Sequence, residues 1–426
     1  MQCLPGKVVM RCLFGFLCVW TLGLVPLAGC SEGGGTFECG DPGLQLTAEG
    51  HEVVYNRALC QGDAMVDSYL VVYDVQTQGR AHRPVWAAAF DVSSDGEVIV
   101  YQTDMIPGQS TLLEIYDRGS GNTTSVDVAE LGPFLYPTVP RISGDGRVAA
   151  FTIQYQGFDY AIFLYDRVTE QIQQATTGPN AASPSLSNDG QFLAYQTNPD
   201  QNEEFGIEVD AELLYSEIRV LDRSSGQSTL VSVNSDGEPA DANSFEPFIS
   251  GDGRFVVFRS SGRNLVTPPP PSSSTRRIAE VYLHDRETGT TSLISRDADS
   301  GGPSGGTTST AVPADWTIVT THGISTGGQF VVYQSNAESI VPLDSQAGRH
   351  DIYRYDAEID RTTRVSVNSL GESANGGSTY TSISDDGRLI AFLTNSTNLH
   401  PNDVDSDLDI YLHDVSTGET TWVSRD

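Results

Sequence analysis

The stretch ISGDGRFVVFRS (residues 249–260) decides the fold, because close copies of it return along the whole chain. Most copies have Ser or Thr, one variable residue, Asp-Gly, an apolar run and then an aromatic residue followed by polar residues. Such self-similarity predicts an array of one small β-unit. The other copies are VSSDGEVIVYQT around Gly96, ISGDGRVAAFTI around Gly146, LSNDGQFLAYQT around Gly190, ISTGGQFVVYQS around Gly328, ISDDGRLIAFLT around Gly387, and a weaker LTAEGHEVVYN around Gly50.

One unit reads as four antiparallel strands. Short apolar segments separated by Asp-Gly and Thr-Gly pairs are typical of strands joined by tight turns. The run from Phe255 to Phe258 is continuously apolar, as expected for a strand that is covered on both faces. Sheets whose central strands are buried on both sides need a neighbour on each face, which is the situation of a propeller blade. The sequence therefore predicts an all-β protein, a single β-propeller.

Two longer phrases carry a family resemblance. SGDGRFVVF with VYLHDRETGTTSLIS, and SDDGRLIAF with IYLHDVSTGETTWVS, resemble the WD-like propeller repeats of the TolB type. The resemblance covers residues 42–426. It implies the fold more strongly than any activity, because this family includes binding scaffolds, peptidase partner domains and lyases.

The number of turn glycines predicts the number of blades. They lie at positions 50, 96, 146, 190, 253, 328 and 387, so we expect seven blades. Because the first unit is degenerate, six blades with an extra N-terminal hairpin is the alternative. The chain stops after an outermost strand, Thr420 to Val423, which leaves no strand to share between the ends. Closure is therefore predicted to rest on packing of the first blade against the last.

The N-terminus has the pattern of an export signal. Lys7 and Arg11 precede an apolar run that ends in Leu27-Ala28-Gly29-Cys30, which resembles a bacterial lipoprotein lipobox. The resemblance implies cleavage before Cys30 and acylation of its thiol, with Ser31 favouring the outer membrane. The predicted parts are a signal peptide (1–29), a lipidated tether (30–41) and the propeller (42–426). An ordinary cleaved leader or a membrane-spanning anchor is the alternative.

Cleavage at that point leaves two unmodified cysteines, Cys39 and Cys60. An even pair in an exported protein predicts a disulfide, and two free thiols are the alternative. Both residues are expected on the same face of the ring, with Cys60 in the first long loop.

The charge is strongly negative. Without the leader the chain has 22 arginines against 56 acidic residues, a formal net charge of −34. Such a field repels nucleic acid and anionic lipid headgroups. We therefore expect no nucleic-acid partner.

Variation in loop length predicts where function lies. Long, unequal loops at 197–215, 261–278, 296–321, 335–349 and 395–408 all fall opposite the short turns. Variable loops on a rigid scaffold are common binding sites. The sequence favours a non-catalytic envelope lipoprotein that binds a protein, peptide or glycan there. A glycan-active enzyme, a polysaccharide lyase or hydrolase, is the alternative, and clustered His/Arg or paired carboxylates in the central mouth would favour it.

The loop NDVDSDLD (402–409) holds the sharpest local chemistry. Asp403, Asp405, Asp407 and Asp409 alternate along it, and converging carboxylates are what Ca²⁺ prefers. No cofactor is required by this interpretation, and a solvated acidic loop is the alternative.

Other motifs predict no catalytic residue. Gly302 to Gly306 (GPSGG) matches the nucleophile-elbow pattern by chance, because no strand precedes it and no helix follows it. His284 and His413 share one position in the YLHD phrase and are interpreted as packing residues. His322, His350 and His400 lie near the variable loops without the spacing of a zinc site. The Pro-rich stretch 266–277 is interpreted as an insertion between strands.

Overall fold

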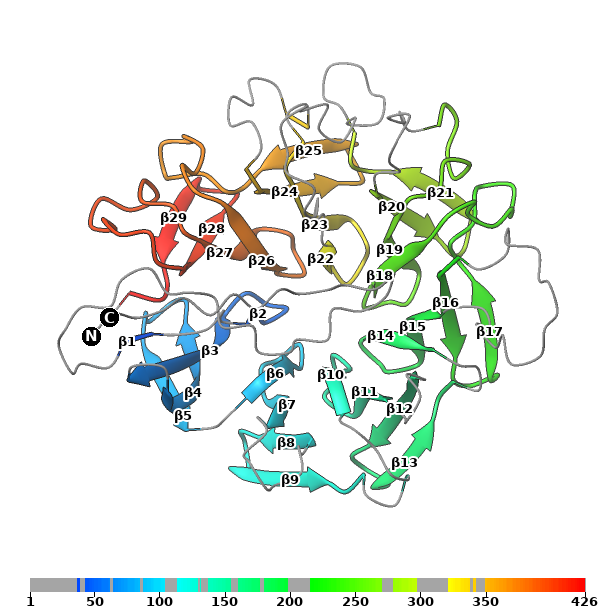
Figure 1. Ribbon diagram of the computed structural model, residues 1–426, viewed down its shortest axis with the longest axis horizontal. Helices are drawn as coiled ribbons and strands as arrows, with labels where there is room; N and C mark the ends of the chain where they lie inside the picture. Colours follow the sequence, from blue (N-terminus) through cyan, green and yellow to red (C-terminus); the bar gives the residue numbers. More distant parts are fainter. Residues whose placement is uncertain are drawn as a thin grey trace, which may run out of the picture.

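The computed structural model describes residues 37–38, 43–61, 64–84, 87–103, 113–128, 131, 137–154, 160–176, 180–197, 215–269, 279–296, 321–337, 340–341 and 349–425. In this part of the chain seven antiparallel sheets stand around a central axis (Figure 1). The predicted all-β propeller is confirmed, with seven blades. The six-blade alternative is wrong, because the degenerate first unit also forms a complete sheet.

Each blade has four consecutive strands that run outward from the axis, and the sheet of blade 1 has one additional short strand, β1. Blades 1 to 4 contain β1 (Phe37–Glu38), β2 (Leu44–Leu46), β3 (Glu52–Gln61), β4 (Ala64–Asp74) and β5 (Arg80–Pro84); β6 (Ala87–Val92), β7 (Val98–Thr103), β8 (Leu113–Asp117) and β9 (Asn122–Val126); β10 (Pro137–Ile142), β11 (Val148–Gln154), β12 (Tyr160–Asp166) and β13 (Gln171–Gln174); β14 (Ala182–Leu186), β15 (Phe192–Thr197), β16 (Glu217–Asp222) and β17 (Gln227–Leu230).

Blades 5 to 7 contain β18 (Ser244–Ile249), β19 (Phe255–Ser260), β20 (Glu280–Asp285) and β21 (Thr290–Leu293); β22 (Thr321–Ile324), β23 (Phe330–Ser335), β24 (Asp351–Asp356) and β25 (Arg361–Arg364); β26 (Ser378–Ile383), β27 (Leu389–Thr394), β28 (Asp409–Asp414) and β29 (Glu419–Trp422). Strand β1 lies inside the predicted tether. It pairs with the far end of β3, so contact with the propeller begins before residue 42.

The repeated Ser-x-Asp-Gly phrase forms the turn between the first two strands of a blade. In blade 2 the Ser93 hydroxyl donates to Asp95 Oδ1 (2.6 Å) and accepts from the Val98 amide (2.9 Å). Asp95 Oδ1 also accepts from the amide two residues on, 3.0 Å away. Four other blades repeat this arrangement, at Ser143, Ser187, Ser250 and Ser384. The turn is thus satisfied within its own residues.

The turn glycines also set how closely blades approach. Each has a positive φ, such as +67° at Gly387, which glycine adopts without steric cost. Each also lies against the start of the second strand of the preceding blade. A Cβ on Gly387 would overlap the Phe330 ring, and one on Gly146 would lie 2.7 Å from Val98 Cγ2. The glycine is therefore required both by the turn and by the neighbouring blade.

A closed belt of hydrogen bonds joins the same turns around the axis. Every link but one runs from backbone amide to backbone carbonyl oxygen, and the exception ends on the Asp385 carboxylate. The links are Ala48 to Ser94, Ser94 to Gly144, Asp145 to Asn188, Asn188 to Gly251, Asp252 to Thr326, Thr326 to Asp385, and Asp385 to Ala48.

The apolar core lies between the blades rather than within one. In the described residues seven buried clusters form, and each combines side chains of two neighbouring blades. Aromatic pairs on the second and third strands extend these layers, such as Phe392 and Tyr411, with ring centroids 6.3 Å apart. Burying large side chains on both faces gives most of the stability of such sheets.

The seam between blades 1 and 7 is closed in the same way as the other six contacts. Val53 and Leu393 belong to one shared cluster. The Leu46 amide donates to the Ser382 hydroxyl (3.0 Å), and Arg80 donates to the Val423 carbonyl oxygen (2.7 Å). The predicted closure by packing, without a shared strand, is confirmed in the described residues, and hydrogen bonds add to it.

Replacing Gly387 by Ala tests the double role of the turn glycine. Gly418→Ala is the matched control, because Gly418 has φ +74° and nothing within 4 Å of its Cβ position. The control should cost about 1–2 kcal/mol of unfolding free energy from φ alone. Gly387→Ala should cost about 1–3 kcal/mol more from overpacking. Thermal and urea unfolding measure both, and equal losses would contradict the packing role.

Candidate functional site

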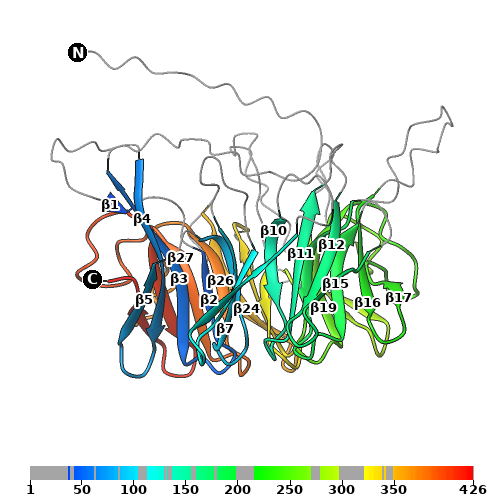
Figure 2. The same cartoon turned by 90° about the horizontal axis from the view of Figure 1, so that it is seen from below.

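The ring has two unlike faces (Figure 2). The turn face carries the short Asp-Gly and Thr-Gly turns. The variable-loop face carries the connections from the second to the third strand and from blade to blade. Of the five predicted long loops, only 395–408 lies entirely within the described residues. It joins β27 to β28, whose ends Thr394 and Asp409 are paired.

The axis of the ring holds a cavity of about 170 Å³ that the innermost strands of all seven blades line. Its wall is chemically mixed, because the equivalent position differs from blade to blade. The residues there are Gln45, Asp91, Arg141, Ser185, Phe248, Gly323 and Ser382.

Several of these side chains hold neighbouring blades together. Asp91 Oδ2 accepts from the Ile142 amide of the next blade (2.9 Å), and the Ser185 hydroxyl accepts likewise from Ile249 (3.1 Å). Burial raises the pKa of Asp91, and the positive charge of Arg141 opposes that shift. The Asp91 carboxylate in the axial cavity thus has a structural partner, the Ile142 amide.

β-Bulges shape the innermost strands toward the variable-loop face. In each of blades 2 to 7 the pairing of the first two strands shifts register near the same place. A bulge tolerates a residue without an amide proton, and Pro140, Pro184 and Pro247 lie there. Glu246, with φ 48°, is turned to meet Arg259 at 3.1 Å. The sequence analysis missed these bulges, although an x-Pro step before the apolar end of the strand marks three of them.

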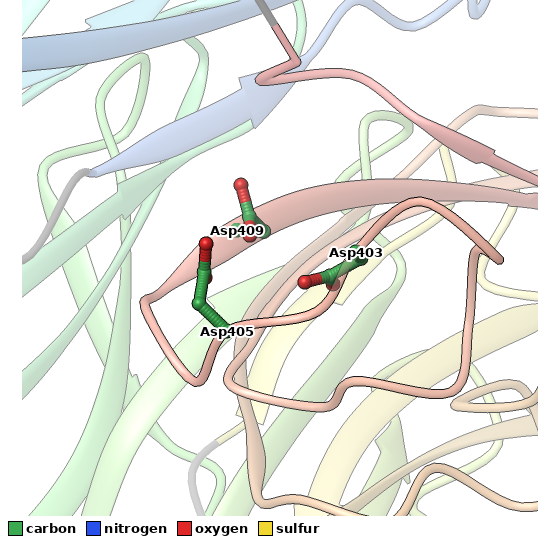
Figure 3. Close-up of side chains that lie close together, drawn as sticks. All are labelled: Asp403, Asp405 and Asp409. Carbon is green, nitrogen blue, oxygen red and sulfur yellow. The ribbon is translucent and has the colours of Figure 1, made fainter.

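The acidic loop brings three of its four predicted aspartates together. One carboxylate oxygen from each of Asp403, Asp405 and Asp409 lies within 4.8 Å of the other two. Figure 3 shows these three side chains close together. Asp403 is 3% exposed, and its Oδ2 accepts from the Tyr411 hydroxyl at 2.7 Å. Asp405 is exposed to solvent. Asp407 is also exposed and does not belong to this group; its amide donates to Asp405 Oδ1.

Asp409 lies at the start of β28, where it is tied to the outermost strand. Its Oδ1 accepts from Ser424 Oγ (2.6 Å) and Trp422 Nε1 (2.7 Å). Burial raises the pKa of Asp409; the two hydrogen bonds oppose this shift, and the charges of Asp403 and Asp405 add to it. Three carboxylates in this arrangement offer oxygen ligands on the variable-loop face.

The two histidines of the YLHD phrase have structural partners, as predicted. His284 Nδ1 bonds Thr291 Oγ1, and His413 Nδ1 bonds Thr420 Oγ1, each at 2.9 Å. Both are packing residues of the blade.

Thr291 and Thr420 are in turn hydrogen-bonded by two near-identical segments, 231–240 and 365–374, which we call straps. Ser235 accepts from the Thr291 amide and Ser369 from the Thr420 amide. Each strap thereby binds the outermost strand of the next blade. The repeat VSVNSxGE in the sequence was the available signal for them.

The other histidines near the variable loops are not shown to converge. His350 Nδ1 contacts Gln334 Nε2 at 2.5 Å, and the His400 ring lies 5.6 Å from that of Trp422. The side chain of His322 lies outside the described residues, as do Gly302 to Gly306 and most of the Pro-rich stretch.

The lipidation and disulfide predictions fall largely beyond the described residues. Cys30 and Cys39 lie outside them, and of Cys60 only the backbone is described. Cys60 was predicted in a loop, but it lies in β3, opposite both Phe37 and Met65, because this hairpin extends past the other blades. Within the described part, no helix has the length and hydropathy needed to span a membrane.

Among the comparisons with known proteins, only the search of solved structures finds matches, and these share the propeller fold. No family model and no curated protein sequence matches this chain. Among solved structures, the β-propeller domain of the Trilobed protease from Pyrococcus furiosus matches with TM-score 0.58 and 10% identity, over 90% of this chain and 98% of that one. That domain is described as having an open velcro topology.

Two further matches are an acylaminoacyl peptidase from Pyrococcus horikoshii and TolB from Acinetobacter baumannii. The peptidase has TM-score 0.56 and 11% identity over 92% of this chain, which spans about half (52%) of that enzyme. TolB has TM-score 0.43 and 15% identity over 88% of this chain and 77% of that one. At 10–11% identity, the likeness to the two structures with TM-scores above 0.5 establishes the propeller fold alone.

Protonation of His284 at acid pH should lower the free energy of unfolding. Burial lowers the pKa of His284 from its ordinary 6.5 to about 4, so between these values the unfolded chain binds more protons than the folded one. Stability should therefore fall as pH drops from about 6.5 to about 4, by at most about 3 kcal/mol from this residue. His284→Asn should flatten that slope in unfolding curves recorded at pH 7 and pH 4.5. Parallel pH profiles for the two proteins would refute this role.

Proposed function

We propose that this chain is an envelope lipoprotein whose propeller binds a protein, peptide or glycan partner through its variable-loop face. The observation that carries the proposal is the unequal use of the two faces. On the turn face the Ser, Asp and Gly residues of the repeat already have structural roles. They form the turn, take part in the belt of hydrogen bonds and pack against the neighbouring blade. The opposite face carries the connections that differ between blades, which is where a rigid scaffold holds its binding residues.

Binding is favoured over catalysis by the partners of the chemically active side chains. Asp91 in the axial cavity accepts a hydrogen bond from a backbone amide of the neighbouring blade. His284 and His413 are buried and bond to threonines. Groups used in this way position the blades and are not poised toward a substrate. A glycan-active enzyme on this scaffold is the alternative function.

The negative charge narrows the class of partner. A formal net charge of −34 for the chain after Cys30 disfavours nucleic acid and favours neutral or basic surfaces. Acyl chains on Cys30 would hold the protein at a bilayer, since each buried CH₂ contributes about 0.8 kcal/mol. A disulfide between Cys39 and Cys60 would tie the tether to the β3–β4 hairpin.

Cys30→Ala tests the anchor. The variant should move from the membrane fraction to the soluble fraction of the envelope, because the acylated thiol is lost. Cys18→Ala, within the predicted leader, is the control and should leave the protein membrane-bound. Immunoblotting of fractionated cells measures both, and retention of the Cys30 variant in membranes would overturn the lipoprotein assignment.

A photo-crosslinking residue at Val404 tests the binding face. Val404 lies on the variable-loop face and is 82% exposed, and Val168 on the turn face is a matched control at 74%. We expect a discrete crosslinked species from position 404 in native envelopes and none from position 168. The opposite result, or equal crosslinking at both positions, would refute the assignment of the face. Degradation of an envelope glycan by the purified protein would instead support the enzyme.

A further inference from the structure

We infer that the loop between β27 and β28 binds one Ca²⁺ through Asp403, Asp405 and Asp409. The inference does not rest on the proposed partner-binding role, because ion binding can be measured on the purified protein alone. The three carboxylates offer oxygens within 4.8 Å of one another, a spacing at which one cation can contact all of them.

A buried oxygen without a partner points to a missing ligand. Asp403 is 3% exposed, and its Oδ2 accepts from Tyr411, while its Oδ1 has no hydrogen-bond partner. Leaving a buried acceptor unsatisfied is costly, and more so for a charged group. A cation bound among the three side chains would satisfy that oxygen and compensate its charge.

The neighbouring blade shows what blade 7 lacks. Asp351 of blade 6 takes the position of Asp409 and likewise accepts from a serine of the outermost strand, Ser366 (2.6 Å). Asp351 also lies 3.6 Å from the Arg364 guanidinium, which supplies a positive charge. In blade 7 the position of Arg364 is taken by Trp422, as the strand registers show. Trp422 donates a hydrogen bond to Asp409 but carries no charge.

In the part of the chain that the structure describes, Asp351 of blade 6 lies beside Arg364, whereas blade 7 brings three carboxylates together and has the neutral donor Trp422 in the position of that arginine. Within the described residues, no ion pair to Asp403, Asp405 or Asp409 is seen. Like charges this close repel one another unless a cation lies between them. A metal ion fits this place better than a basic side chain of a partner, because Asp403 is buried.

The donor set selects the kind of ion. The three side chains offer only carboxylate oxygens, which hard cations prefer over zinc or copper. Ca²⁺ accepts six to eight oxygens in irregular geometry and can complete its shell with backbone oxygens and water, whereas Mg²⁺ demands a near-ideal octahedron. An irregular loop with one buried, one exposed and one half-buried carboxylate suits Ca²⁺.

Two single substitutions in the same loop test the site. Asp405→Asn removes a cluster ligand, and Asp407→Asn removes another exposed charge, two residues away, that lies outside the cluster. Isothermal titration with CaCl₂ should show one site in the wild type and in Asp407→Asn. Affinity should fall at least about tenfold in Asp405→Asn, because ligand charge tunes the Kd of such sites over orders of magnitude.

Thermal unfolding supplies the second readout. Ca²⁺ at about 100 times its Kd should raise the Tm of the wild type and of Asp407→Asn by about 3–6 °C relative to chelator. In chelator, Asp405→Asn should unfold at the same temperature as the wild type or higher, because one like charge is gone. Absence of a calcium response in the wild type, equal responses of the two variants, or an equal response to Mg²⁺ would overturn the assignment.

Discussion

The structure depends on one constraint: every blade is apolar on both faces, so no blade can be stable without a neighbour on each side. Residues such as Val257 and Phe258 point to opposite faces of the same strand, and both are fully buried, in different inter-blade clusters. A row of such sheets would leave an apolar face exposed at each end, which is the liability of any open array. Closing the row into a ring removes both ends at once.

Closure must therefore be as good at the seam as elsewhere, and the repeat provides this. The belt runs through the residue between Ser and Asp in the turn phrase and, at Asp145 and Asp252, through the amide of the Asp itself. The glycine admits the side chain of the preceding blade. Because the belt uses mainly backbone groups, it tolerates Ala48, Asn188 and Thr326 at equivalent places. The weak first copy keeps these features although its sequence has drifted. That is why it forms a full blade and why the contact of Ala48 with Asp385 resembles the other six.

The features that follow from sequence periodicity could be predicted, whereas the contacts between residues of different blades could not. Turn glycines and apolar runs are local signals, so the blade count and the strand order followed from them. The x-Pro step at the Glu246 bulge and the VSVNSxGE repeat of the straps are local signals, but neither names the partner residue, such as Thr291 for Ser235. The belt joins residues far apart in the chain, and no local pattern specifies such contacts. The acidic loop shows the same limit. Alternation made Asp407 equivalent to its neighbours, but the loop folds so that Asp407 faces solvent while Asp409 is held by Ser424 and Trp422.

The same division explains where chemistry is free to vary. A turn that must satisfy its own amides, admit a neighbouring side chain and continue the belt is constrained in length and at its glycine, although other positions in it vary. The connections on the other face carry none of these duties, so their length and charge can change from blade to blade. Blades 6 and 7 illustrate this freedom in the part of the chain that the structure describes. Blade 6 compensates its buried aspartate with Arg364, and blade 7 has Trp422 at that position and groups Asp403 and Asp405 with its aspartate. Such a change of side chains leaves the blade intact, because only the variable-loop face is altered.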